Sequence, residues 1–237
     1  MKSAAARVPN VLSIAGSDPS GGAGIQADIK SISANGGYAM SAITALTAQN
    51  TQGVTGVLNV DTDFITAQLD SVAEDVHIDA IKIGMLSSVD IITAVKNFLT
   101  RIKTSQSPAP VVVLDPVMVA TSGDRLLSVD AETAVKELID SADLITPNVP
   151  ELAVLAGADR AVDLAQARVQ AQELAAKHDV LVLLKGGHLP ADDDGLLTAH
   201  RRVGGRRRAS AAVAAAGYQG VLSANRWRGN RKNWPAS

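Results

Sequence analysis

Short apolar runs alternate with helical patterns along most of this chain. Continuous apolar runs bounded by Gly, Pro or polar clusters are typical of buried strands. The clearest is Val111 to Leu114, which lies between prolines. The complete set of predicted strands is residues 11–14, 38–45, 54–60, 80–83, 111–114, 144–146 and 180–184.

Between these strands, apolar residues recur every three or four positions, as on one face of a helix. Helices are predicted from residue 25 to the stop signal at Asn35-Gly36-Gly37, after a cap at Thr62 or Asp63, after a cap at Ser88, and over residues 131–141 and 164–178. Strands that alternate with helices favour right-handed βαβ crossovers. The prediction is an α/β fold with a mostly parallel central sheet and helices on both faces.

Composition fits this fold class. The 237 residues are 46% hydrophobic but only 3% aromatic, and they suffice for one sizeable core. No apolar run is long enough for a transmembrane helix, and residues 1–8 lack a secretory signal pattern. The absence of Cys excludes disulfides and thiolate metal sites. We therefore expect a cytoplasmic protein.

The net charge of −2 hides two unlike segments. Residues 1–199 contain 13 Lys and Arg and all 24 Asp and Glu, whereas residues 200–237 contain 9 Lys and Arg and no acid. Both tryptophans, Trp227 and Trp234, also lie in this last segment. This break predicts one α/β domain over residues 1–195 and a basic, aberrant tail over residues 196–237.

Residues able to do chemistry follow several predicted strands at the point where each strand ends. In an open α/β sheet, the carboxyl ends of the strands form the edge where ligands bind. Polar loops alone would produce some of this pattern, but its recurrence favours a binding site. The residues are Asp18 with its neighbouring glycines, Met85, Asp115, Asn148 with Glu151, and the run Lys185-Gly186-Gly187-His188.

The Gly-rich segment over residues 15–24 is the first of these strand ends. It is neither a Walker A loop, since no Gly-Lys-Ser/Thr follows, nor a dinucleotide-binding fingerprint. Its backbone N–H groups are suited to hold a ligand at a helix N-terminus. By physics alone, a tight turn and a binding loop are equally good interpretations.

The same segment carries a family resemblance. Residues 15–30, 43–51 (Ile-Thr-Ala-Leu-Thr-Ala-Gln-Asn-Thr) and 82–86 (Lys-Ile-Gly-Met-Leu) closely resemble the hydroxymethylpyrimidine/phosphomethylpyrimidine kinases of thiamine biosynthesis. The strings at residues 115–118, 121–124, 146–148 and 185–188 extend the resemblance in unbroken order, over about residues 10 to 189. It implies a ribokinase-like fold.

The resemblance implies a pyrimidine site. Gln49 would bind the aminopyrimidine edge with one amide donor and one acceptor. Gly16, Met85 and Val117 would line the pocket, with the Met thioether against the ring. Asp28, one helical turn past Gly24, would face the substrate. Three of these residues have a purely structural alternative: a polar strand end for Gln49, a core residue for Met85, and a solvated carboxylate for Asp28.

The resemblance also implies that ATP and Mg²⁺ bind at the later strand ends. Asn148 and Glu151 match an Asn-x-x-Glu element that helps hold Mg²⁺ and its waters, with Asp115 assisting. Lys185 would neutralise nucleotide phosphate charge. The alternatives are a first-turn carboxylate for Glu151, favoured by the helix dipole, and a surface lysine for Lys185.

No catalytic residue is assigned, because one family feature is missing. The family has a Gly-Thr-Gly-Cys or Gly-Ala-Gly-Cys turn whose helix N-terminus holds the transferring phosphate. This chain has no such turn and becomes Arg-, Ala- and Gly-rich from about Leu196, with no pattern that continues the sheet. The simplest hypothesis is a frameshift that leaves the kinase fold incomplete. The alternative is a genuine basic tail that binds nucleic acid or an acidic partner.

The predicted function is therefore ATP- and Mg²⁺-dependent phosphorylation of 4-amino-5-hydroxymethyl-2-methylpyrimidine and of its monophosphate, with activity impaired by the missing turn. A pyridoxal kinase of the same fold and a catalytically dead pyrimidine-binding protein are the alternatives. Gln49 and the Ile83-Gly84-Met85-Leu86 string favour the pyrimidine. No membrane partner is expected, nucleic acid would bind only through the tail, and the oligomeric state stays open, a homodimer included.

Overall fold

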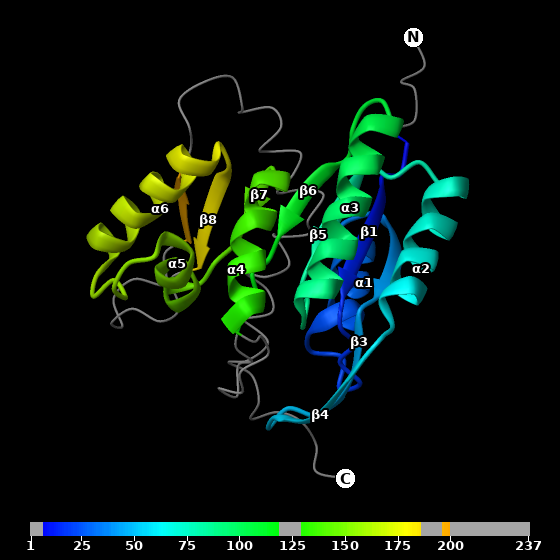
Figure 1. Ribbon diagram of the computed structural model, residues 1–237, viewed down its shortest axis with the longest axis horizontal. Helices are drawn as coiled ribbons and strands as arrows, with labels where there is room; N and C mark the ends of the chain where they lie inside the picture. Colours follow the sequence, from blue (N-terminus) through cyan, green and yellow to red (C-terminus); the bar gives the residue numbers. More distant parts are fainter. Residues whose placement is uncertain (1–6, 119–128, 186–195, 200–237) are drawn as a thin grey trace.

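The apolar runs of the sequence form a seven-stranded sheet in the part of the chain that the structure describes (Figure 1). The computed structural model describes residues 7–118, 129–185 and 196–199. The first six strands of the order are parallel and the last is antiparallel to its neighbour. In sheet order they are β2 (Tyr38–Ile43), β1 (Asn10–Ala15), β5 (Ala80–Ile83), β6 (Val111–Leu114), β7 (Leu144–Ile145), β8 (Leu181–Lys185) and β9 (Leu196–Ala199).

Helices cover both faces of this sheet, as predicted. One face packs α2, α3, α4 and α6 into a single apolar core, whereas Ile32 of α1 packs with Val11 and Ala80 on the opposite face. None of the described helices is long and apolar enough to cross a membrane. The helices are α1 (Gly24–Ala34), α2 (Thr62–Asp75), α3 (Val89–Ser105), α4 (Val129–Leu138), the 3-10 helix η1 (Ile139–Ser141), α5 (Val149–Ala156) and α6 (Leu164–His178).

The prediction of one strand over residues 38–45 was wrong, because the run is divided at Thr44. The Thr44 hydroxyl donates to the carbonyl of Met85 at 2.9 Å, and its own carbonyl accepts from the Val60 N–H at 3.0 Å. These contacts take the chain out of the sheet. The next residues form β3 (Ala45–Gln49), which pairs with β4 (Val54–Asn59) in a separate antiparallel ribbon.

Besides β3, two further elements are missing from the predicted set of helices and strands. Helix α5 has only eight residues, too few for a periodic pattern, and it is defined instead by the Asn148–Glu151 capping box and a proline in its first turn. Strand β9 pairs antiparallel with β8, with Lys185 opposite Leu196. The sheet therefore continues through residues 196–199, and the expectation that it ends before Leu196 was wrong.

Candidate active site

The Gly-rich loop between β1 and α1 is organised by the buried carboxylate of Asp18. Its Oδ1 accepts from the Ser20 N–H and hydroxyl at 2.8 and 2.7 Å, and its Oδ2 accepts from the N–H groups of Gly22 and Ala23 at 2.9 and 2.8 Å. Ala23 has no side chain that can cap α1. Asp18 thus supplies the negative charge that the N-terminus of α1 favours.

Two glycines allow this loop to fold tightly against β1. Gly24 has a positive φ of 55°, and a Cβ there would collide with the carbonyl oxygen of Gly16. A Cβ on Gly16 would lie 2.5 Å from the Met85 methyl group. The structure therefore brings the predicted pocket residues Gly16 and Met85 into direct contact.

The ribbon strand β3 is tied to the same loop. The Ser17 N–H donates to the carbonyl of Ala45 at 2.8 Å, and the Thr47 hydroxyl donates to the Ser17 carbonyl at 2.8 Å. Gln49, further along β3, is half-buried, and its Oε1 accepts from the Thr47 hydroxyl at 3.3 Å. Gln49 thus lies on a strand that is anchored to the Gly-rich loop.

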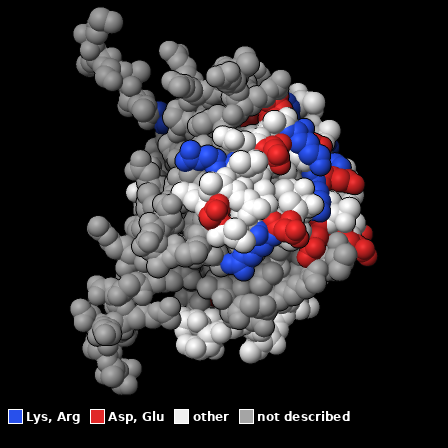
Figure 2. Space-filling model, turned by 90° about the vertical axis from the view of Figure 1, so that its left-hand side faces the viewer, with Lys and Arg blue, Asp and Glu red and all other residues white. Residues whose placement is uncertain are grey.

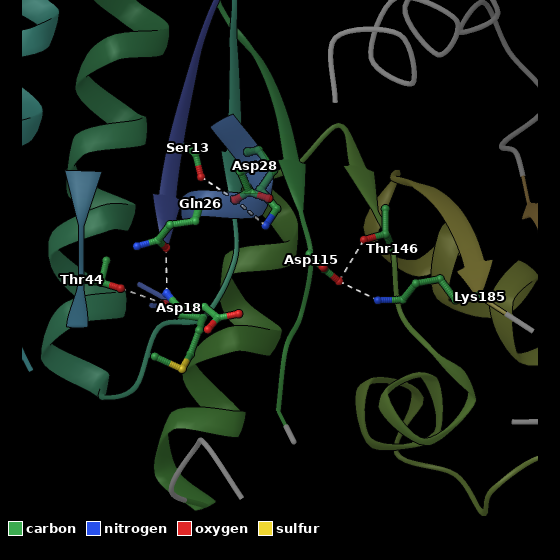
Figure 3. Close-up of polar contacts among 10 residues, drawn as sticks. Ser13, Asp18, Gln26, Asp28, Thr44, Asp115, Thr146 and Lys185 are labelled. Atoms are coloured by element: carbon green, nitrogen blue, oxygen red, sulfur yellow. Dashed lines mark hydrogen bonds and ion pairs between the residues drawn. The ribbon is translucent and has the colours of Figure 1, made fainter. Parts of the chain in front are cut away.

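Asp28 lies on α1, near Ser13 of β1, and its contacts are with protein groups (Figure 3). Its Oδ2 accepts from the Ser13 hydroxyl at 2.6 Å and from the Lys82 ammonium at 2.8 Å. These two partners lie opposite each other on β1 and β5. A direct role of Asp28 in substrate binding stays a prediction.

The ends of β6, β7 and β8 carry a second group of polar side chains (Figure 3). Asp115 follows β6, and its Oδ1 accepts from the Lys185 ammonium at 2.8 Å and from the Thr146 hydroxyl at 3.1 Å. Lys185 also lies 3.8 Å from Oε2 of Glu151. One ammonium group is therefore shared between two carboxylates.

Asn148 and Glu151 form the capping box of α5. The Asn148 side chain accepts from the Glu151 N–H at 2.8 Å, and Glu151 Oε2 accepts from the Asn148 N–H at 2.7 Å. Both interpretations of Glu151 are therefore compatible with its position: the carboxylate caps the helix, and it also faces Lys185.

Burial and charge set the protonation of this group. Burial raises the pKa of Glu151 to about 7, against the opposing effect of Lys185. Burial would also raise the pKa of Asp115, but the ammonium groups of Lys185 and Lys82 outweigh it and lower that pKa below its ordinary value. Burial lowers the pKa of Lys185, yet Asp115 and Glu151 more than compensate and raise it. At neutral pH, Asp115 and Lys185 form an ion pair.

The predicted site residues thus fall into two clusters on one edge of the sheet. Gly16, Met85 and Gln49 belong to the first, and Asp115, Asn148, Glu151 and Lys185 belong to the second. Val117, half-buried, follows Asp115 and donates its N–H to the Asp115 carbonyl at 2.8 Å. The run 186–188 lies outside the described residues. A separate cavity of about 540 Å³ between α3 and α4 contains none of these residues.

Sequence reasoning missed several polar residues that support these clusters. Ser13 and Lys82 lie within runs that read as apolar strands, and Thr146 ends another. Their contacts become visible only in the folded chain, where Ser13 lies opposite Lys82 and Thr146 lies next to Asp115. The one available signal was a Lys inside the otherwise apolar strand 80–83, because a buried charge requires a partner.

Within the described residues, no group of three or more His, Asp or Glu side chains forms a metal site. Two carboxylates, Asp115 and Glu151, share the Lys185 ammonium. Mg²⁺ keeps much of its hydration and is often bound through one or two carboxylates together with substrate phosphates. Asp115 and Glu151 therefore fit a Mg²⁺ ion that is bound together with phosphate.

Comparisons with known proteins agree with this architecture. The family model of phosphomethylpyrimidine kinase matches residues 18–215. The thiamine biosynthesis multifunctional protein ThiED of Corynebacterium glutamicum is 52% identical over 181 residues, which are 76% of this chain and 23% of that protein. The hydroxymethylpyrimidine/phosphomethylpyrimidine kinase of Escherichia coli is 50% identical over 186 residues, 78% of this chain and 67% of that protein. The chain thus spans about a quarter of the first relative and two thirds of the second.

Solved structures of related kinases have a similar fold. A phosphomethylpyrimidine kinase from Clostridium difficile superposes with a TM-score of 0.72 at 36% identity, covering 92% of this chain and 95% of that one. The ADP complex of Bacillus subtilis pyridoxal kinase has a TM-score of 0.71 at 30% identity, covering 88% and 82%. These neighbours share the ribokinase-like α/β fold. The chain therefore belongs to the phosphomethylpyrimidine kinase family.

Proposed function

We propose that this chain transfers the γ-phosphoryl group of ATP to 4-amino-5-hydroxymethyl-2-methylpyrimidine and to its monophosphate, in thiamine diphosphate biosynthesis. The observation that carries the proposal is the placement of two clusters on one sheet edge in a member of this family. Gly16 and Met85 lie in contact in one cluster, and Asp115 and Lys185 form an ion pair in the other. Phosphoryl transfer requires an acceptor pocket beside a site for phosphate charge.

The first cluster is the proposed pyrimidine pocket. Met85 and Val117 offer apolar surface to the ring, and Gly16 leaves room for the Met85 methyl group because it lacks a Cβ. The Gln49 amide is complementary to a ring nitrogen beside an exocyclic amine. Asp28 joins this pocket as the predicted substrate-facing carboxylate.

The second cluster is the proposed phosphate site. Lys185 offers an ammonium group to the phosphate oxygens, and Asn148 lies next to it at the start of α5. Asp115 and Glu151 would hold Mg²⁺, through its waters. Bound Mg²⁺ would neutralise phosphate charge that builds up during the transfer. The protein residues themselves orient the nucleotide and keep its phosphates close to the hydroxymethyl group.

We further propose that this chain is a poor catalyst. The sequence has no Gly-x-Gly-Cys turn, and the loss of even one donor to developing negative charge costs on the order of 10² to 10³ in rate. The segment 196–237 would then be an out-of-frame tail on a domain of residues 1–195, although β9 (Leu196–Ala199) still pairs with β8 and the family match reaches residue 215. Sequencing the gene through codons 190–210 tests the frameshift directly.

The test of function measures binding and turnover on one sample. Calorimetry with the hydroxymethylpyrimidine should show binding, and a steady-state assay with ATP and Mg²⁺ should show turnover far below the roughly 1 to 100 per second typical of kinases. Binding with no turnover would support the catalytically dead pyrimidine-binding protein instead. Turnover in the normal range would refute the impairment, and absence of binding would refute the proposed substrate.

Pyridoxal phosphorylation is the second candidate, because a pyridoxal kinase of known structure is 30% identical to this chain. Competition between the hydroxymethylpyrimidine and pyridoxal in the same calorimeter decides between them. We expect the pyrimidine to bind more tightly, through Gln49. Tighter binding of pyridoxal would reverse the assignment.

The proposed partners are small molecules, and the expected location is the cytoplasm. Acidic and basic side chains are interspersed on the described surface at the α6 end of the molecule (Figure 2), rather than gathered into a basic patch of the kind that nucleic acid requires. Nucleic acid would then bind only through the basic tail, with an affinity that falls steeply as salt rises. The oligomeric state stays open, a homodimer included, and sedimentation would measure it.

A further inference from the structure

Thr47 is a polar residue that the proposed function leaves without a role. It lies on β3, two positions before Gln49, and successive side chains of a strand alternate between its two faces. Leu46 and Ala48 are exposed, whereas Thr47 and Gln49 are half-buried. Thr47 and Gln49 therefore share one face of β3, and the contacts of Thr47 show that this face is turned toward the Gly-rich loop.

Thr47 is joined to the Gly-rich loop by two groups. Its N–H donates to the Ser17 hydroxyl at 3.2 Å, and its own hydroxyl donates to the Ser17 carbonyl at 2.8 Å. This carbonyl belongs to the peptide group between Ser17 and Asp18. The N–H of the same peptide group donates to Gln26 Oε1 at 2.7 Å (Figure 3). One peptide group of the loop is thus fixed from both sides, by β3 and by α1.

The Thr47 hydroxyl also contacts the amide of Gln49. Its single hydrogen is shared between the Ser17 carbonyl and Gln49 Oε1, which lies 3.3 Å from the hydroxyl oxygen. The terminal torsion of a Gln side chain is broad and roughly twofold, so the orientation of the amide depends on its contacts. The contact with Thr47 therefore restrains the Gln49 amide and relates it to the loop.

The pairing of β3 with β4 is irregular at Gln49. Ala48 lies opposite Gly56, but Gln49 lies opposite Val54, so the register shifts between these two residues of β3. An irregularity of this kind disrupts the ladder locally and changes the direction of a side chain. The regular ladder thus gives Gln49 less guidance than a residue within a regular strand receives, and the side-chain contact with Thr47 gains importance.

We propose that Thr47 is a positioning residue of the pyrimidine pocket: its hydroxyl orients the Gln49 amide and fixes it relative to the Gly-rich loop. Without the hydroxyl, the amide would rotate more freely, and its freedom would be lost when the substrate binds. A side chain that is already ordered avoids this loss of entropy, and affinity is higher. The inference rests on the proposed function, in which Gln49 binds the aminopyrimidine edge.

The experiment measures binding of the hydroxymethylpyrimidine by calorimetry. Thr47→Val removes the hydroxyl and keeps the branched shape, and it should lower the affinity by about threefold to tenfold, the range of a typical net hydrogen-bond contribution. Thr47→Ser keeps the hydroxyl and should bind within about twofold of the wild type. Thr66→Val is the matched control, because Thr66 of α2 is half-buried and its hydroxyl donates to the Thr62 carbonyl at 2.9 Å.

The double variant Thr47→Val/Gln49→Ala separates positioning from stability. If Thr47 acts through Gln49, then Thr47→Val should change the affinity by less than about twofold once Gln49 is Ala, because the group that Thr47 orients is already gone. A general weakening of the fold would lower the affinity in both backgrounds. Thermal unfolding of the same variants measures that weakening separately.

Each result has one interpretation. If Thr47→Val lowers the affinity equally with Gln49 and with Ala at this position, Thr47 only supports the ribbon and the inference is wrong, while the proposed function stands. Wild-type affinity in Thr47→Val would also refute it, and so would failure of Thr47→Ser to restore binding, because the hydroxyl would then not be the group that matters. If the wild type binds no pyrimidine, the proposed function fails, and the inference fails with it.

Discussion

The Lys185 ammonium donates a 2.8 Å hydrogen bond to Asp115 Oδ1, although the two residues are 70 positions apart in the chain. They follow β6 and end β8, and β7 lies between these strands in the sheet. Thr146, at the end of β7, donates to the same carboxylate oxygen. Three strand ends therefore converge on one oxygen atom, and this arrangement is the basis of the proposed phosphate site.

Gln49→Ala should weaken binding of the hydroxymethylpyrimidine. An unmet donor and acceptor at a buried edge typically cost about 1 to 3 kcal/mol. Gln49 is half-buried on β3, whereas Gln52, in the exposed turn that follows, provides a matched control as Gln52→Ala. Calorimetry measures both. Unchanged affinity in Gln49→Ala would remove this residue from the pocket.

Gly16→Ala and Gly24→Ala should have different consequences. A Cβ on Gly16 meets the flexible end of Met85, so the side chain moves, the fold persists and pyrimidine binding weakens. A Cβ on Gly24 meets the backbone carbonyl of Gly16 at a positive φ, so the loop itself must shift. Thermal unfolding should show a clearly larger loss for Gly24→Ala. A larger loss for Gly16→Ala would contradict this account of the loop.

Asp18→Ala should destabilise the Gly-rich loop. The carboxylate accepts hydrogen bonds from three backbone N–H groups and one hydroxyl, and it is only 2% exposed. We expect a loss on the order of 2 to 4 kcal/mol in the free energy of unfolding, because hydrogen bonds to charged groups are strong. Denaturant titration against Asp75→Ala, at an exposed position of α2, provides the comparison. Equal effects of the two variants would show that Asp18 does not organise the loop.

Glu151 should make stability depend on pH. Its pKa is raised from 4.5 to about 7, so between these values the folded chain keeps a proton that the unfolded chain has lost. Stability should therefore fall as pH rises through this window, by up to about 3 kcal/mol, and change little above it. Asp115 does not interfere, because its lowered pKa affects stability only below its ordinary value of 3.8.

Glu151→Gln tests this pH dependence, because glutamine can still accept the hydrogen bond of the capping box but does not titrate. Denaturant titrations at the two ends of the window should give a flatter slope for Glu151→Gln than for the wild type. Glu74→Gln, at an exposed position of α2, is the control. A slope in Glu151→Gln equal to that of the wild type would assign the pH dependence to another group.

Most of the parallel sheet could be predicted from the chain, because its strands are continuous apolar runs. The run 111–114 became β6 with the predicted bounds, and the run 80–83 became β5. Prediction was wrong at Thr44, where hydrogen bonds to Met85 and Val60 divide one apolar run into two strands. It missed α5, whose signal is a capping box and not a period.

The sequence by itself determined the family and the chemical inventory of the site, because strings such as residues 15–30 and single residues such as Gln49 are properties of the chain order alone. Only the tertiary structure decided which of the charged residues form ion pairs with one another. Lys82 forms its ion pair with Asp28, which lies 54 positions earlier in the chain, on α1. The physical reason is that electrostatic interactions depend on distance in space and on burial, and the crossing of parallel strands sets both.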